Sequence, residues 1–181
     1  MLTDNKLEEI RTVLADVTPQ ARIYIGCDSQ RYMDKQSIWH ASYSTAVVVH
    51  NIDDNGVGHG ARVFIETVRM VDYDNHKSKP FSRMMQECYL AVEAYQQLEE
   101  ELLEYGVEIH LDINKSAMHG SNVALNAAVG YAKGVTGRPV MTKPDAFAAS
   151  FVADHGVRGK FERPFQSAFP KRSGKSGRHL N

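Results

Sequence analysis

Four acidic side chains occupy places in the sequence from which they could share one site for divalent metal ions. Asp28 closes the strand-like run RIYIGCD, and Asp112 lies near the end of the alternating run VEIHLDI. Glu87 falls beside the apolar stripe of a predicted helix, and Asp154 falls near the end of the last predicted helix. Hard cations such as Mg²⁺ and Mn²⁺ bind oxygen ligands, which carboxylates supply. Two such ions about 3.5–4 Å apart support the hydrolysis of phosphodiester bonds.

Each of these acids also has an ordinary explanation when it is taken alone. Aspartate is common where a strand gives way to a turn, which would account for Asp28. Asp154 shares a predicted helix face with Phe147 and Phe151, where an unpaired charge would be costly to bury. A metal ion would compensate that charge, and so would partial exposure with a hydrogen bond to a loop. The metal site is therefore predicted from the four acids together.

Several polar residues near these acids could contact a phosphate backbone. They are Ser29, Lys115, Ser116, Lys143, Lys171 and Arg172. The segment 114–122 would lie at a helix N-terminus, which favours anions. Capping of that helix by Ser121 or Asn122 is the more ordinary explanation. We therefore expect capping in this segment, with phosphate contact as the alternative.

Histidine and cysteine side chains offer one further metal arrangement. His110 and Asp112 point to the same face of a predicted strand, and together with His155 they could bind one zinc or manganese ion. Cys27 and Cys88 have no CxxC or CxxH spacing, which argues against a structural zinc site and against a disulfide framework. Such cysteines suit a reducing compartment, so we expect a cytoplasmic protein.

The chain of 181 residues has the size of one domain, and its 43% hydrophobic and 24% charged residues are typical of a soluble globular protein. We expect residues 1–155 to form that domain and residues 156–181 to form a basic tail. The tail has seven lysines and arginines against one glutamate. It could hold a phosphate backbone in a salt-dependent way, or it could serve only for solubility. Neither a signal peptide nor an apolar run of the roughly 20 residues that cross a bilayer is found in the sequence.

The elements that must position the acids can be predicted from hydrophobic periodicity and turn residues. The predicted fold class is α/β, a five-stranded mixed α+β sheet with helices packed on it, in the order β-β-β-α-β-α-β-α. A short helix over 7–17 precedes the sheet, and Gly106 is expected to end the longest helix. Strands are expected over 22–28, 39–50, 61–71, 107–113 and 138–142, and helices over 81–105, 121–134 and 144–155.

Two classes of nucleotide-handling protein are disfavoured by the sequence. The fingerprints GxGxxG and GxxxxGK[ST] do not occur in it, and a dinucleotide-binding fold would not begin with three hairpin-linked strands. Trp39 and Tyr43 could stack on bases, although core packing is their more ordinary role. Nucleic acid thus stays a plausible partner, while a glycine-rich phosphate loop is excluded.

Three stretches, YIGCDSQ, EIHLDIN and KPDAFAASFVADH, resemble the ribonuclease H-like superfamily and, more narrowly, its bacterial YkuK-type family. The resemblance covers about residues 20–155. It implies a ribonuclease H-like fold and a nuclease that hydrolyses phosphodiester bonds by a two-metal-ion mechanism with Mg²⁺ or Mn²⁺.

The same resemblance implies particular site residues and substrates. The residues that would serve as catalytic metal ligands are Asp28, Glu87, Asp112 and Asp154. The substrate would be RNA, DNA or a hybrid of the two. Gln30 stands where proofreading exonucleases carry the second acid of a D-x-E motif, which argues against that class. The alternative is a non-catalytic nucleic-acid-binding module of the same fold.

Overall fold

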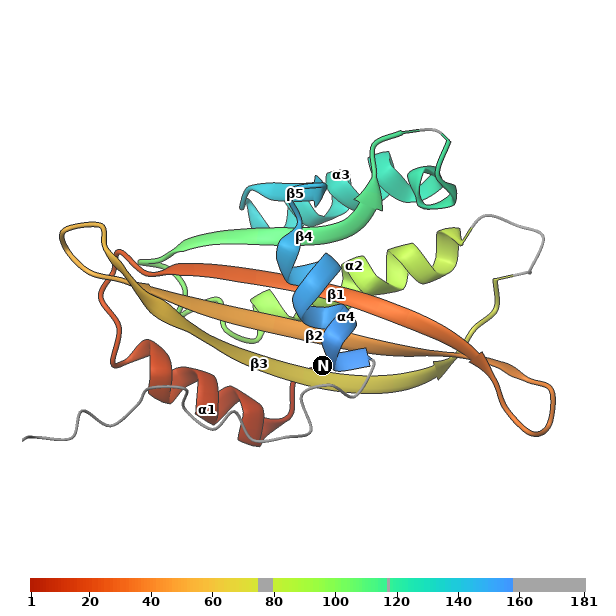
Figure 1. Ribbon diagram of the computed structural model, residues 1–181, viewed down its shortest axis with the longest axis horizontal. Helices are drawn as coiled ribbons and strands as arrows, with labels where there is room; N and C mark the ends of the chain where they lie inside the picture. Colours follow the sequence, from red (N-terminus) through yellow and green to blue (C-terminus); the bar gives the residue numbers. More distant parts are fainter. Residues whose placement is uncertain (75–79, 117, 158–181) are drawn as a thin grey trace, which may run out of the picture.

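A five-stranded mixed sheet lies at the centre of the computed structural model, which describes residues 1–74, 80–116 and 118–157 (Figure 1). The strands are β1 (Arg22–Met33), β2 (Trp39–Ile52), β3 (Gly58–Val71), β4 (Gly106–Asn114) and β5 (Val140–Lys143). Their order in the sheet is β3-β2-β1-β4-β5. The first three strands pair antiparallel, while β4 pairs parallel with β1 and with β5. The predicted five-stranded mixed sheet is therefore confirmed.

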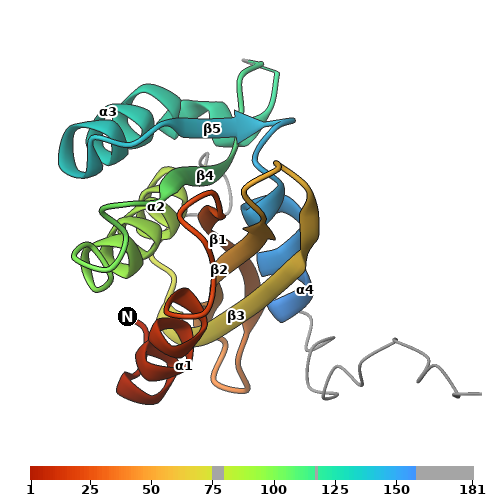
Figure 2. The same cartoon turned by 90° about the vertical axis from the view of Figure 1, so that its left-hand side faces the viewer.

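Helices cover both faces of this sheet. They are α1 (Asp4–Leu14), α2 (Phe81–Gln96), the 3₁₀ turn η1 (Gly120–Ala124), α3 (Leu125–Thr136), the π-helical η2 (Ala148–Ala153) and α4 (Asp154–Val157). Figure 2 shows α2 and α3 on one side of the sheet and α4 on the other. The main apolar core lies on the α2 side, where Ile25, Cys88 and Ile109 are fully buried. Within the described ranges, every helix is too short or too polar to span a membrane.

The first strand is longer than its apolar run predicts. Its pairing with β2 continues to the partners Tyr32 and His40 and then Met33 and Trp39, so β2 supplies backbone hydrogen-bond partners well past Asp28. The two strands form a hairpin arm that extends beyond the helices (Figure 1). The prediction that Asp28 closes the strand was wrong, because this carboxylate lies within β1.

The longest helix is shorter than predicted. It ends at Gln96, turns follow, and Gly106 begins β4 instead of capping the helix. Arg138 reaches these turns from the far end of α3: its Nε donates to Tyr95 Oη at 3.1 Å, and its Nη2 donates to the Leu102 carbonyl at 3.1 Å. A carbonyl group in the turns that follow α2 is thus bound by a distant side chain, which no local pattern encodes.

The last helix also begins later than predicted. The sequence predicts a helix over 144–155 that begins near Pro144, yet helical winding begins only at Ala148. The N–H of Ala148 donates to Nδ1 of His110 at 3.1 Å, so the buried imidazole on β4 holds the first turn. The winding is of the π type through η2 and becomes α-helical at Asp154.

Gly26 lets this last helical segment pack directly on β1. A Cβ atom at Gly26 would lie 2.7 Å from the backbone nitrogen of Ala149 and 3.0 Å from the carbonyl oxygen of His110. Ala148 and Ala149 are fully buried at this contact. A strand glycine that allows so close a backbone approach sets the height of η2 above the sheet, and thereby the position of Asp154.

Candidate active site

Asp28 and Asp112 lie on adjacent strands at the same level of the sheet. β1 and β4 pair in parallel as far as Cys27 and Leu111, and the next residue on each strand is one of the two aspartates. Side chains alternate along a strand, so Asp28 points to the same face as Gly26, the face that η2 covers. The two carboxylates therefore lie under the last helical segment.

Asp28 is the electrostatic centre of the site. Its pKa is raised from 3.8 to about 7, first by burial and then by the negative charges of Asp112 and Asp154. The N–H of Ser29, which donates to Asp28 Oδ1 at 2.8 Å, and the ammonium of Lys143 act in the opposite direction. Asp112 on β4 and Asp154 on α4 are thus both close enough to repel the charge of Asp28.

Glu87 joins this group from α2. Only 2% of its surface is exposed, and burial followed by the charge of Asp28 raises its pKa well above the usual range. Its Oε1 accepts a hydrogen bond from Ser29 Oγ at 2.5 Å, while its buried Oε2 has no hydrogen-bond partner in the described part of the chain. Asp112 also interacts electrostatically with Glu87. Charge interactions thus link the four predicted acids through Asp28, and we call Asp28, Glu87, Asp112 and Asp154 the carboxylate cluster.

Neighbouring polar groups hold two of these carboxylates. Asp112 Oδ1 accepts a hydrogen bond from Ser150 Oγ at 2.6 Å and pairs with Lys143 Nζ at 2.9 Å. Arg83 Nη1 donates to Ser29 Oγ at 2.9 Å and lies 3.7 Å from Glu87 Oε1. The sequence reasoning missed Arg83 and Ser150. Each stands four residues before one of the predicted acids, on the same helix face, and that spacing could have identified both.

The chemistry of the donors fits a hard divalent cation. Within residues 1–74, 80–116 and 118–157, no three His, Cys, Asp or Glu side chains converge closely enough to hold an ion. The cluster nevertheless supplies four carboxylates, two with raised pKa values, and the Glu87 Oε2 that lacks a partner. Carboxylate oxygens are the ligands that Mg²⁺ and Mn²⁺ prefer, and a bound cation would offset the repulsion between them.

The other predicted phosphate contacts lie apart from this cluster or outside the described residues. Lys115 and Ser116 are exposed on the loop after β4. The predicted capping was wrong: Ser121 Oγ accepts the Asn114 N–H at 3.2 Å, and Asn122 Nδ2 donates to the Lys115 carbonyl at 2.9 Å. These side chains tie the loop to β4 instead of binding the helix N–H groups. The predicted tail contacts Lys171 and Arg172 lie outside the described residues.

The alternative histidine site is not supported by the environment of His110. Its ring is buried, its Nδ1 accepts the Ala148 N–H, and its Nε2 lies 3.3 Å from Glu108 Oε2. Burial lowers the pKa of His110, which keeps the ring neutral as this acceptor role requires. Nδ1 is thus engaged in positioning η2, and Nε2 is engaged with Glu108 on the same strand. The side chain of His155, the third residue of that arrangement, lies outside the described ones.

The raised pKa of Asp28 predicts how stability depends on pH when metal ions are removed. Its pKa is about 7 in the folded chain and near 4 when unfolded. Its contribution to stability is therefore fully present below about pH 4 and is lost as the pH rises through 7. In chelator, we expect the free energy of unfolding of the wild type, relative to Asp28→Asn, to fall between pH 4 and pH 8. Urea titrations at both pH values test this, and a difference that is independent of pH would contradict it.

A family model described as "Ribonuclease H-like" matches residues 6–158 of the chain. No curated protein and no solved structure matches it. The matched range contains the whole sheet and all four members of the carboxylate cluster.

Proposed function

Because the chain belongs to the ribonuclease H-like family, we propose that it is a metal-dependent nuclease that hydrolyses phosphodiester bonds of nucleic acid. The observation that carries the proposal is the carboxylate cluster of Asp28, Glu87, Asp112 and Asp154. A cluster with raised pKa values and a buried oxygen without a partner is costly unless it binds a cation. Such a cluster in a nuclease-like fold supports hydrolysis over binding alone.

Each residue of the cluster has a role in this proposal. Asp28 and Asp112, on adjacent strands, would hold Mg²⁺ or Mn²⁺ ions, and Glu87 and Asp154 would complete the ligand sets. Bound as a pair, such ions supply charge neutralisation and activation of water for attack on a phosphodiester. Lys143, whose ammonium already lies 2.9 Å from Asp112, would neutralise a phosphate oxygen.

Cleavage assays on labelled substrates test the proposal. We expect cutting of at least one of single-stranded RNA, single-stranded DNA, duplex DNA and RNA–DNA hybrid with Mg²⁺ or Mn²⁺, and none with chelator, because the carboxylates alone cannot activate water. Binding of these substrates without cutting under any metal condition would instead favour the non-catalytic nucleic-acid-binding module. Equal cutting with metal and with chelator would contradict the metal dependence.

A further inference from the structure

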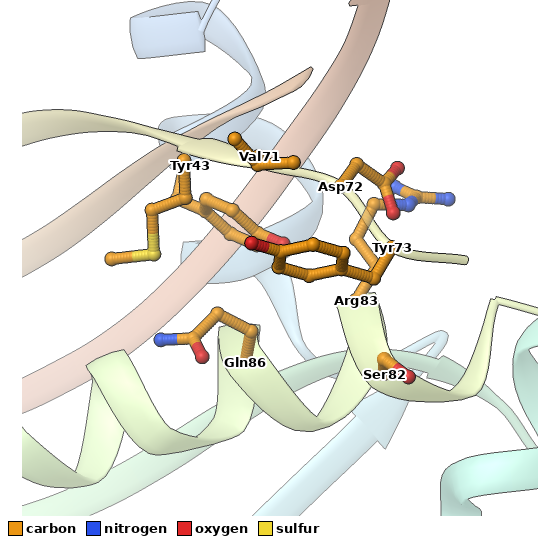
Figure 3. A pocket seen from close by; sticks show the side chains of 8 residues that line it. Tyr43, Val71, Asp72, Tyr73, Ser82, Arg83 and Gln86 are labelled. Carbon is orange, nitrogen blue, oxygen red and sulfur yellow. The ribbon is translucent and has the colours of Figure 1, made fainter. Parts of the chain in front are cut away.

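A pocket of about 300 Å³ lies where the end of β3 meets the first turns of α2 (Figure 3). Its lining residues are Tyr43, Met70, Val71, Asp72, Tyr73, Ser82, Arg83 and Gln86. The volume is at the lower end of those that hold small molecules, which are about 300–1,000 Å³. The pocket is thus large enough for one flat ring system and too small for a folded partner.

Two tyrosines and one glutamine are among its lining residues. Tyr43 is buried in the sheet and forms the inner wall, while Tyr73, of which 87% is exposed, lies at the opening. Figure 3 shows the Gln86 amide extending from α2 toward the same space as these rings. An amide carries both donors and an acceptor, and a tyrosine ring offers a face for stacking. The combination suits a planar ligand with hydrogen-bonding edges.

Arg83 provides an unused donor beside this space. Its Nε is buried and has no hydrogen-bond partner among the described residues, although a buried N–H is costly to leave unpaired. Guanidinium donors match carbonyl and phosphate oxygens. The Arg83 side chain lines the pocket and is 18% exposed, so a ligand that brings such an oxygen would reach its guanidinium group.

The pocket shares Arg83 with the carboxylate cluster. The Nη1 of this arginine donates to Ser29 Oγ at 2.9 Å, and that hydroxyl donates to Glu87 at 2.5 Å. Tyr43 lies within electrostatic reach of both Asp72 and Glu87. A ligand in the pocket would therefore lie on the α2 face of the sheet, two hydrogen bonds from Glu87, the cluster member on that face.

We propose that this pocket binds the base of one unpaired nucleotide, and that the substrate is therefore single-stranded beside the cleavage site. This inference rests on the proposed nuclease function, because the pocket is described by its place relative to a cleavage site. Tyr73 would stack on the base, Gln86 would bind its edge, and Arg83 would bind an oxygen of the nucleotide. A base paired within a duplex cannot insert between these side chains, whereas a single strand can present it.

Binding assays in the Asp28→Asn background, with Mg²⁺ present, test the pocket without cleavage. Fluorescence anisotropy would compare a short single-stranded oligothymidylate, a duplex of equal length and an abasic strand of equal length. We expect the single strand to bind about tenfold more tightly than either the duplex or the abasic strand. Tyr73→Ala should weaken single-strand binding about tenfold and leave abasic binding unchanged, since one stacked base is lost. Gln86→Ala should weaken it about fivefold, as for one hydrogen bond.

Variants of exposed residues on α2 serve as controls for Tyr73→Ala and Gln86→Ala. Tyr89→Ala removes an exposed tyrosine of α2 that packs against Tyr131, and Gln96→Ala removes an exposed glutamine at the end of α2. Both residues lie outside the pocket, so both variants should bind all three nucleic acids as the parent protein does. Equal binding of normal and abasic strands, or unchanged binding by Tyr73→Ala, would overturn the base pocket.

The failure of this inference is distinguishable from that of the nuclease proposal. If the wild type cuts nucleic acid while the Tyr73 variant keeps its base-dependent binding, the base pocket is overturned and the nuclease stands. If nothing is cut but base-dependent binding is lost in Tyr73→Ala, the base pocket is supported and catalysis is not.

Discussion

Replacing Asp28 by Asn is expected to reduce metal-dependent cleavage at least about a thousandfold while the protein stays folded, the range seen when one member of a catalytic unit is removed. Asparagine has nearly the shape of aspartate, and its carbonyl oxygen can still accept the Ser29 N–H. What is lost is the charge at the centre of the cluster. Initial cleavage rates with Mn²⁺, together with circular dichroism, provide the measurement.

The control for this variant is a carboxylate far from the cluster. Asp54 is exposed in the turn between β2 and β3, so Asp54→Asn should cut at the wild-type rate. Asp112→Asn should behave like Asp28→Asn, with some added loss of stability, because Lys143 and Ser150 both bind the Asp112 carboxylate. Wild-type cleavage in both cluster variants would refute the proposed metal ligands.

The second large effect is expected at a residue that carries no functional group. Gly26→Ala should destabilise the fold by about 1–3 kcal/mol, because the new methyl group would lie 2.7 Å from the backbone nitrogen of Ala149. Relief of that contact must move η2 away from β1. Since η2 leads into Asp154 and carries Ser150, we expect cleavage to fall about a hundredfold as well, as for a displacement of about 1 Å. Urea unfolding and cleavage rates measure the two effects.

Gly130 provides the matched control for this substitution. It lies within α3, where an added Cβ atom would meet no other atom within 4 Å. Gly130→Ala should therefore stabilise the fold by about 0.5–1 kcal/mol, as alanine does in a helix interior, with cleavage unchanged. Equal stability and activity of the Gly26→Ala variant and the wild type would show that the close approach does not position η2.

The order of the strands along the chain could be predicted because each strand has its own clear pattern. The run at Val47 and Val49 and the alternation around Ile109 are local signals, and the residues concerned are buried as that pattern implies. Element ends were predicted less well, because distant residues determine them. The length of β1 depends on β2, the end of α2 is accompanied by contacts from Arg138, and the first turn of η2 is held by His110.

The candidate site likewise has a part that could be predicted from the sequence and a part that could not. The acids could be singled out from their places in predicted elements, and the structure places the other three within electrostatic reach of Asp28, although their catalytic role stays a prediction. Their immediate partners could not be chosen with the same reasoning. Ser150 contacts Asp112 from η2, which Gly26 allows to pack closely on β1. Arg83 reaches Ser29 across the interface between α2 and the sheet.

The parallel pairing of β1 with β4 also has a consequence for how the protein folds. The first three strands are joined by hairpins and can pair as soon as they are synthesised, whereas β4 can join only after the α2 crossover has been made. Asp112 and Asp154 both belong to the part of the chain that is added later. Because Asp112 lies on β4, its carboxylate can meet that of Asp28 only when β4 joins the three hairpin-linked strands.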